Sequence, residues 1–145
     1  MHRQPRPRGA RPLLALFVLL VSACLPTPAA STATVTLGLY SGRPDPSWQI
    51  TPAQAAALLR DADAAPVRAP VPAQGDRLGY RGVRLVVTGA AGAELAAYNG
   101  VLSVTRNGTA TVHNDPGRAL ERRLLETGVA TIEPAQMGEL LREFP

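Results

Sequence analysis

Two side chains in the second half of the chain have the types and spacing for acid–base chemistry. His113 and Asp115 are separated by one residue, and an imidazole beside a carboxylate can take up and return a proton. Ser103, upstream of both, could supply a hydroxyl, but no G-x-S-x-G nucleophile motif surrounds it. The strand register predicted below turns His113 toward the polar face beside a helix cap. We therefore favour a structural or solvated histidine and expect no catalytic residue here.

Composition argues against metal and nucleic-acid ligands. One cysteine and two histidines are too few for the usual zinc sites, so we expect no metal and no cofactor. The 15 basic and 11 acidic residues give a formal charge of +4. Four of the arginines precede Cys24, and after it 11 arginines balance 11 acids. A balanced chain lacks the excess positive charge on which nucleic-acid binding depends.

Residues 1–23 have the organisation of a secretory signal peptide. A basic segment without acids, 1–12, is followed by a continuously apolar run, 13–21, and then by the small residues Ser22 and Ala23. The apolar run is shorter than the roughly 20 residues that a transmembrane helix needs. We expect this segment to be removed and the protein to be exported.

The residues Val21-Ser22-Ala23-Cys24 resemble the lipobox of bacterial lipoproteins, in which an apolar residue and two small ones precede a modified cysteine. The resemblance implies cleavage before Cys24, a diacylglycerol thioether on its sulfur and an acylated amino group. Two or three acyl chains would hold the protein on the extracytoplasmic side of a membrane, whereas one chain anchors poorly. Residues 24–33 would then form a flexible tether. The alternative is ordinary signal cleavage near Ala23 or Ala30.

The most distinctive segment is 40–48, with the sequence YSGRPDPSW. It resembles the SGRPNPSW segment of a family of small, uncharacterised bacterial envelope proteins, and residues 78–82 (LGYRG) resemble the second segment that these proteins share. Asp45 replaces the expected asparagine, which changes the charge of the loop. The family has no assigned activity, so the resemblance implies none here.

Two interpretations of these segments stay open. In the structural one, Trp48 packs on a neighbouring proline and Arg43 caps carbonyls or forms an ion pair. In the functional one, the prolines present a rigid recognition patch at low entropic cost, built from the Trp, Tyr and Arg anchors common in interfaces. The residues of this candidate binding patch are Arg43, Asp45, Trp48, Tyr80 and Arg81.

The rest of the sequence predicts a single α+β domain over residues 34–145. Residues 33–40 alternate apolar and small side chains, which is typical of a half-buried strand. Three further alternating segments and a fourth after Gly108 predict a meander of hairpins. A Pro-rich loop at 64–76 separates them from the first helix.

The turn residues predict the register of the first hairpins. Asn99-Gly100 favours a two-residue turn, which places Ala97 opposite Leu102. A three-residue loop at 89–91 places Leu85 opposite Leu95. Both choices keep the apolar side chains on one face, as a buried face requires.

The second Asn-Gly pair, Asn107-Gly108, is expected to turn differently. A two-residue turn would oppose Leu102 to His113 and direct Val112 outward. A three-residue loop opposes Leu102 to Val112 instead and keeps the apolar face continuous, so we predict the longer loop.

Three helix starts are visible. Thr51, Pro52 and Gln54 have the spacing of a capping box, and Asp115-Pro116 and Glu133-Pro134 begin a second and a third helix. Gly128 should close the second helix in a left-handed conformation, with Val129 packed on Leu124. The predicted order is β-α-ββββ-α-α: a mostly antiparallel sheet of about five strands with the helices packed on one face.

These patterns predict the cellular location of the protein more clearly than its activity. We expect a cell-envelope protein anchored to a membrane through lipid on Cys24, with a non-catalytic binding or structural domain and a protein, peptide or glycan partner. The alternative is a secreted envelope hydrolase or an enzyme inhibitor. A hydrolase should show a concave pocket that joins His113 to a carboxylate or a serine.

Overall fold

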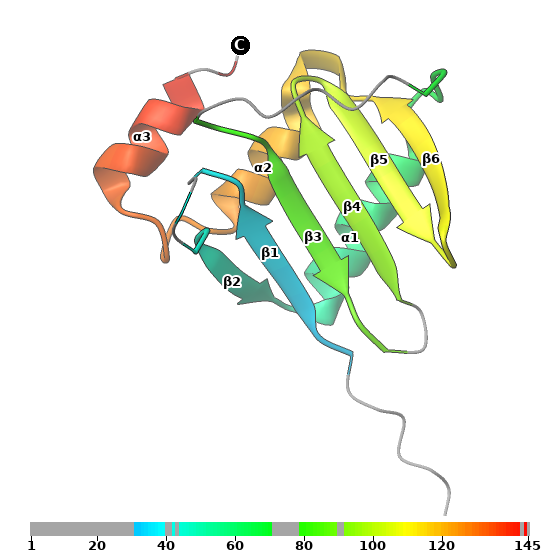
Figure 1. The fold of residues 1–145 in the computed structure, drawn as a ribbon, viewed down its shortest axis with the longest axis horizontal. Coiled ribbons are helices and arrows are strands. Elements are labelled where there is room, and N and C mark those ends of the chain that lie inside the picture. Colours follow the sequence, from blue (N-terminus) through cyan, green and yellow to red (C-terminus); the bar gives the residue numbers. More distant parts are fainter. Residues whose placement is uncertain are drawn as a thin grey trace, which may run out of the picture.

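The computed structural model describes residues 31–39, 42, 44–70, 79–89, 92–142 and 144. The predicted signal peptide, Cys24, most of the tether and Arg43 lie outside the described residues. The described residues form one antiparallel sheet with helices on one of its faces (Figure 1). The predicted α+β class is therefore confirmed.

The sheet has six strands in the order β2-β1-β3-β4-β5-β6, and every neighbouring pair is antiparallel. Their bounds are β1 Ala33–Leu37, β2 Ser47–Ile50, β3 Val83–Val87, β4 Ala93–Tyr98, β5 Val101–Arg106 and β6 Thr109–Asn114. The helices are α1 Pro52–Ala64, α2 Ala119–Glu126 and α3 Pro134–Arg142, and a short 3-10 helix, η1, spans Pro116–Arg118. Among the described residues no helix is both long and apolar enough to cross a bilayer.

The strand beyond the expected five is β2, which was predicted to be part of a rigid loop. Trp48 and Ile50 are buried, whereas Ser47 and Gln49 are exposed, so this short segment alternates as an edge strand does. It pairs with β1, placing Trp48 opposite Val35. The prolines before and after β2 concealed it, because two apolar residues make a weak period-2 signal.

The predicted register is confirmed in the first hairpins. Leu85 lies opposite Leu95, and Ala97 lies opposite Leu102. Asn99 and Gly100 both have positive φ angles, 49° and 78°, as the type I′ turn requires. The inner face of the sheet, together with α1 and α2, forms a core made mainly of Leu, Val and Ala.

The three-residue loop predicted at Asn107-Gly108 is wrong. These residues have φ angles of 51° and 77°, so they form a second two-residue turn, and Leu102 lies opposite His113. The twist of the type I′ turn matches that of the flanking strands, and this local preference outweighs the apolar alternation. His113 consequently points to the inner face and is 3% exposed, while Val112 lies on the outer face.

Helix α1 begins as predicted. The Thr51 hydroxyl accepts from the Gln54 backbone N–H at 3.2 Å, and the Gln54 side chain accepts from the Thr51 N–H at 3.0 Å. The predicted stripe of α1 is buried and consists of Ala55, Leu58, Leu59 and Ala62.

The predicted ends of α2 need correction. Asp115 and Pro116 lead into η1, and α2 starts only at Ala119. Gly128 does not have a positive φ angle, and Val129 is 56% exposed, so the predicted left-handed cap and its apolar contact are absent from this helix end. The third helix starts at Pro134, as predicted.

Candidate binding surface

The structure brings the two distinctive segments of the sequence together at one end of the sheet. Arg81 Nη2 lies 2.8 Å from Asp45 Oδ2, and Asp45 Oδ1 accepts from the Leu39 N–H at 2.9 Å. The backbone around Arg81 is held by two hydrogen bonds with Gly38, one of them from the Gly38 N–H to the Gly82 carbonyl. Asp45 and Arg81 therefore form an ion pair at the strand ends, with side chains 22% and 42% exposed.

Trp48 belongs to the core and not to the exposed patch. Its side chain is 7% exposed, and Nε1 donates to Thr127 Oγ1 at 2.8 Å. The indole lies so close to Gly128 that a Cβ on that glycine would be 2.6 Å from the ring. The structural interpretation of the segment therefore applies to Trp48, whose indole contacts the α2–α3 connection.

Tyr80 joins the outer side of the sheet to the helix layer. Its ring is 5.9 Å from that of Tyr98, centroid to centroid, and its hydroxyl donates to Glu121 Oε1 at 2.6 Å. Burial, followed by the hydrogen bond to the Glu121 carboxylate, raises the pKa of the Tyr80 hydroxyl well above its ordinary value. Tyr80 is thus fixed through its polar end.

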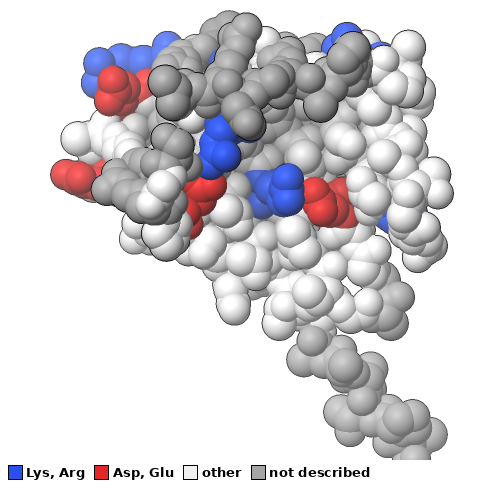
Figure 2. Space-filling model, in the orientation of Figure 1, with Lys and Arg blue, Asp and Glu red and all other residues white. Residues whose placement is uncertain are grey.

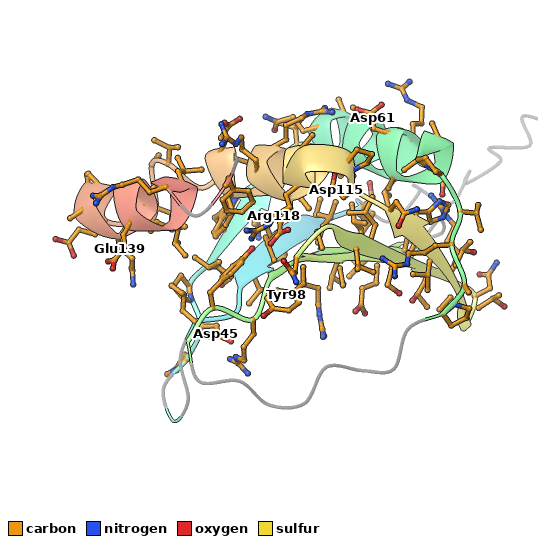
Figure 3. The ribbon with its side chains drawn as sticks, turned by 90° about the horizontal axis from the view of Figure 1, so that it is seen from above. Asp45, Asp61, Tyr98, Asp115, Arg118 and Glu139 are labelled. Carbon is orange, nitrogen blue, oxygen red and sulfur yellow. The ribbon has the colours of Figure 1, made fainter. Side chains whose placement is uncertain are left out.

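Glu121 is fully buried and is balanced by Arg118. Arg118 Nε donates to Oε2 at 3.0 Å and Nη2 donates to Oε1 at 2.9 Å, a bidentate arrangement. The hydrogen bonds with Glu121 raise the pKa of Arg118. The guanidinium carbon lies 3.8 Å from the centre of the Phe144 ring. Figure 3 shows Arg118 between the helix layer and the strands.

The sequence patterns did not predict the cluster formed by Glu121, Arg118 and Tyr80. Glu121 lies between apolar residues of the α2 stripe, and charged side chains are seldom fully buried unless they are paired. One signal was available, because Arg118 and Glu121 have the i, i+3 spacing of a helical ion pair. What the sequence could not show is that Tyr80 reaches the same carboxylate from 41 residues away.

The residues considered for acid–base chemistry, His113, Asp115 and Ser103, do not form one site. Both carboxylate oxygens of Asp115 accept backbone N–H groups, those of Leu120 and Glu121, each at 2.9 Å. His113 Nδ1 lies 2.9 Å from the Ala65 carbonyl oxygen. Ser103 lies on the outer face of β5, opposite Val112, whereas His113 points to the inner face. His113 and Asp115 thus have separate structural roles, and Ser103 is on the other side of the sheet.

All the described helices lie on the inner face of the sheet (Figure 1), and its outer face is hollowed above β1, β3 and β4. The hollow has a volume of about 430 Å³, and its lining includes Asp45 and Arg81, which pair with each other, and Arg84, whose Nε is 3.3 Å from Glu94 Oε1. Arg84 stands between Thr36 and Ala96 on the outer face, and Val86 and Tyr98 also line the hollow. A depression that combines apolar side chains with a few charged ones is typical of ligand-binding sites.

Within the described residues no group of three or more His, Cys, Asp or Glu side chains is arranged to hold a metal ion. Comparisons of the chain with models of protein families, with curated protein sequences and with solved structures found no match.

Proposed function

We propose that this protein is a lipid-anchored component of a bacterial cell envelope whose domain binds a partner through the hollow on the outer face of its sheet. The anchor is the lipid on Cys24, and the partner is a protein, peptide or glycan segment. The observation that carries the binding role is the hollow itself, whose lining combines small side chains with the ion-paired Asp45, Arg81 and Arg84.

The polar groups around the hollow support recognition rather than turnover. The pair formed by Asp45 and Arg81 and the pair formed by Arg84 and Glu94 are partly exposed, so both can exchange partners with a ligand at small cost. The candidates for acid–base chemistry point elsewhere: His113 lies on the inner face, and Asp115 caps α2. The hydrolase alternative would need such a group beside the hollow.

A crosslinking pull-down from native membranes tests this proposal. The variant Ala96→Gln places a longer, uncharged side chain in the lining of the hollow, and Thr105→Gln makes a comparable change on the same face of β5, outside the residues that line the hollow. Ala96→Gln should lower the capture of the crosslinked partner about tenfold or more, while Thr105→Gln should leave it unchanged. Equal capture by wild type and both variants, with all three chains folded, would contradict the proposed binding surface.

A further inference from the structure

The point at which the chain enters the domain is well defined. Thr32, just before β1, accepts from the Thr88 N–H through its carbonyl at 2.9 Å, and the two threonine hydroxyls are 2.7 Å apart. Thr32 is therefore attached to the end of the sheet at which β1 begins and β3 ends. In Figure 1 β1 begins at this end, opposite the end at which β1 finishes and β2 starts.

The distance from this point to Cys24 is short. Eight residue steps separate Cys24 from Thr32, which span at most about 29 Å when fully extended and about 15 Å as a random coil. A strand of six residues is itself about 20 Å long. A lipid on Cys24 therefore keeps the entry end of the sheet close to the membrane, because the average tether is shorter than the strands.

The same end carries little charge. The termini of the strands, the first turn of α1 and the turn before β6 meet there, and among their described residues Glu94 and Arg106 are charged. Glu94 Oε1 lies 3.3 Å from Arg84 Nε. Arg106 itself is neutralised by a bidentate ion pair with Asp63, at 2.7 and 2.8 Å. On the helix side, Arg123 and Glu126 line a second hollow together with Gln54 and carry opposite charges. In Figure 2 the lower part of the described surface shows neither acidic nor basic side chains.

An end whose few charges are balanced by opposite charges can approach lipid headgroups without strong repulsion from anionic lipids. We propose that the end of the sheet around Thr32, Thr88 and the start of α1 is the membrane-apposed surface of the domain, its partner being the lipid surface that holds Cys24. The ion pair of Asp45 and Arg81 at the edge of the hollow then lies at the end of the sheet away from the membrane, where a partner can reach it. This inference rests on the proposed lipidation of Cys24.

Energy transfer from single dye labels to a headgroup-labelled lipid tests the orientation. The lipidated protein is purified from membranes and reconstituted in phosphatidylcholine vesicles, with the new cysteine Ala53→Cys or Thr109→Cys at the proposed near end, or Glu139→Cys on α3. A lipid on the Cys24 sulfur leaves the introduced thiol as the one that reacts with the dye. Transfer from the two near labels should exceed transfer from the α3 label several-fold, at low and at high salt, because the charges of the apposed end balance one another.

Two results would overturn the inference, and they are distinguishable. Equal or reversed transfer on chains that sediment with the vesicles would show that the domain has no such orientation, while leaving the anchor intact. Labelling of Cys24 in the wild type, together with loss of vesicle binding, would show that the anchor itself is absent. Circular dichroism identical to that of the wild type establishes that each variant is folded, and the two near labels check one another.

Discussion

At the scale of single residues, the least expected assignment is that of Trp48. Its aromatic ring and its place in the distinctive segment suggested a recognition anchor, yet the ring is buried against Gly128 and its Nε1 is bonded to Thr127. A glycine at position 128 is explained by this contact and not by the helix cap that its position suggested. The side chain of Trp48 thus ties the edge strand β2 to the connection between α2 and α3.

Replacing Gly128 with Ala should therefore destabilise the fold. The new methyl group would lie 2.6 Å from the indole, and overpacking of a core costs about 1–3 kcal/mol. Gly138→Ala in α3 is the matched control, because no heavy atom lies within 4 Å of its added Cβ and an alanine favours a helix by about 1 kcal/mol. Urea denaturation should show a lower free energy of unfolding for the first variant and an equal or higher one for the second. A wild-type midpoint for Gly128→Ala would refute the role assigned to Trp48.

Tyr80 allows a prediction about alkaline stability. Burial beside Glu121 keeps the pKa of its hydroxyl above the ordinary value of about 10, so the unfolded chain loses this proton at lower pH than the folded chain. The stabilisation is complete below that ordinary value and is lost as the pH rises above it toward the folded pKa. The free energy of unfolding of Tyr80→Phe, measured between about pH 8 and pH 11, should fall less steeply than that of the wild type. Parallel curves for the two proteins would contradict the environment described for Tyr80.

At the scale of elements, the junction between β6 and α2 shows that a capping side chain need not stand immediately before its helix. Asp115 was predicted to be the residue before the helix, and a short 3-10 helix intervenes instead. The carboxylate still accepts the N–H groups of Leu120 and Glu121, which lie in the first turn of α2. Capping chemistry was therefore identified correctly from the residue type, while its exact geometry depended on the left-handed backbone of Arg118, with φ of 54°.

Asp115→Ala should weaken this junction. Loss of a capping acceptor costs about 1–2 kcal/mol, and Asp115 is 5% exposed, so water replaces it poorly. Asp61→Ala is a suitable comparison, because its carboxylate forms an exposed ion pair with Arg123, a kind of contact worth less than about 1 kcal/mol. In thermal unfolding, the midpoint temperature of Asp115→Ala should lie well below that of Asp61→Ala. The reverse order would show that Asp115 does not hold the start of α2.

At the scale of the whole molecule, the Asp45–Arg81 pair beside the candidate binding surface and the entry of the chain lie at opposite ends of one sheet. The hollow lies on the face that the helices leave open, and the tether reaches the domain at Thr32. Such an arrangement suits a protein held at a surface and approached from the opposite side, which is the role proposed for it.

The anchor makes a separate prediction for the full chain. Cys24→Ser removes the sulfur that would carry the lipid, so the protein should move from the membrane fraction to the soluble envelope fraction. Ser22→Ala keeps a small residue before the cleavage site and should stay on the membrane. Cell fractionation and the mass of the mature N-terminal peptide measure both effects. Membrane retention of Cys24→Ser at the wild-type level would refute the lipid anchor.

Local patterns by themselves determined most of the elements of this protein. The capping box at Thr51, the apolar stripe of α1 and the turn at Asn99-Gly100 depend on residues close in the chain, so their geometry follows from local sterics and hydrogen bonding. They also sufficed for the α+β class and for pairing Leu85 with Leu95.

Tertiary packing decided the remainder. The edge strand β2 and the contact of Trp48 with Gly128 each require a partner from another part of the chain. The same holds for the carboxylate of Glu121, which is buried because Arg118 and Tyr80 both donate to it. Such contacts leave no periodic trace in the sequence, since the free energy that stabilises them comes from groups that meet only once the sheet and its helices have assembled.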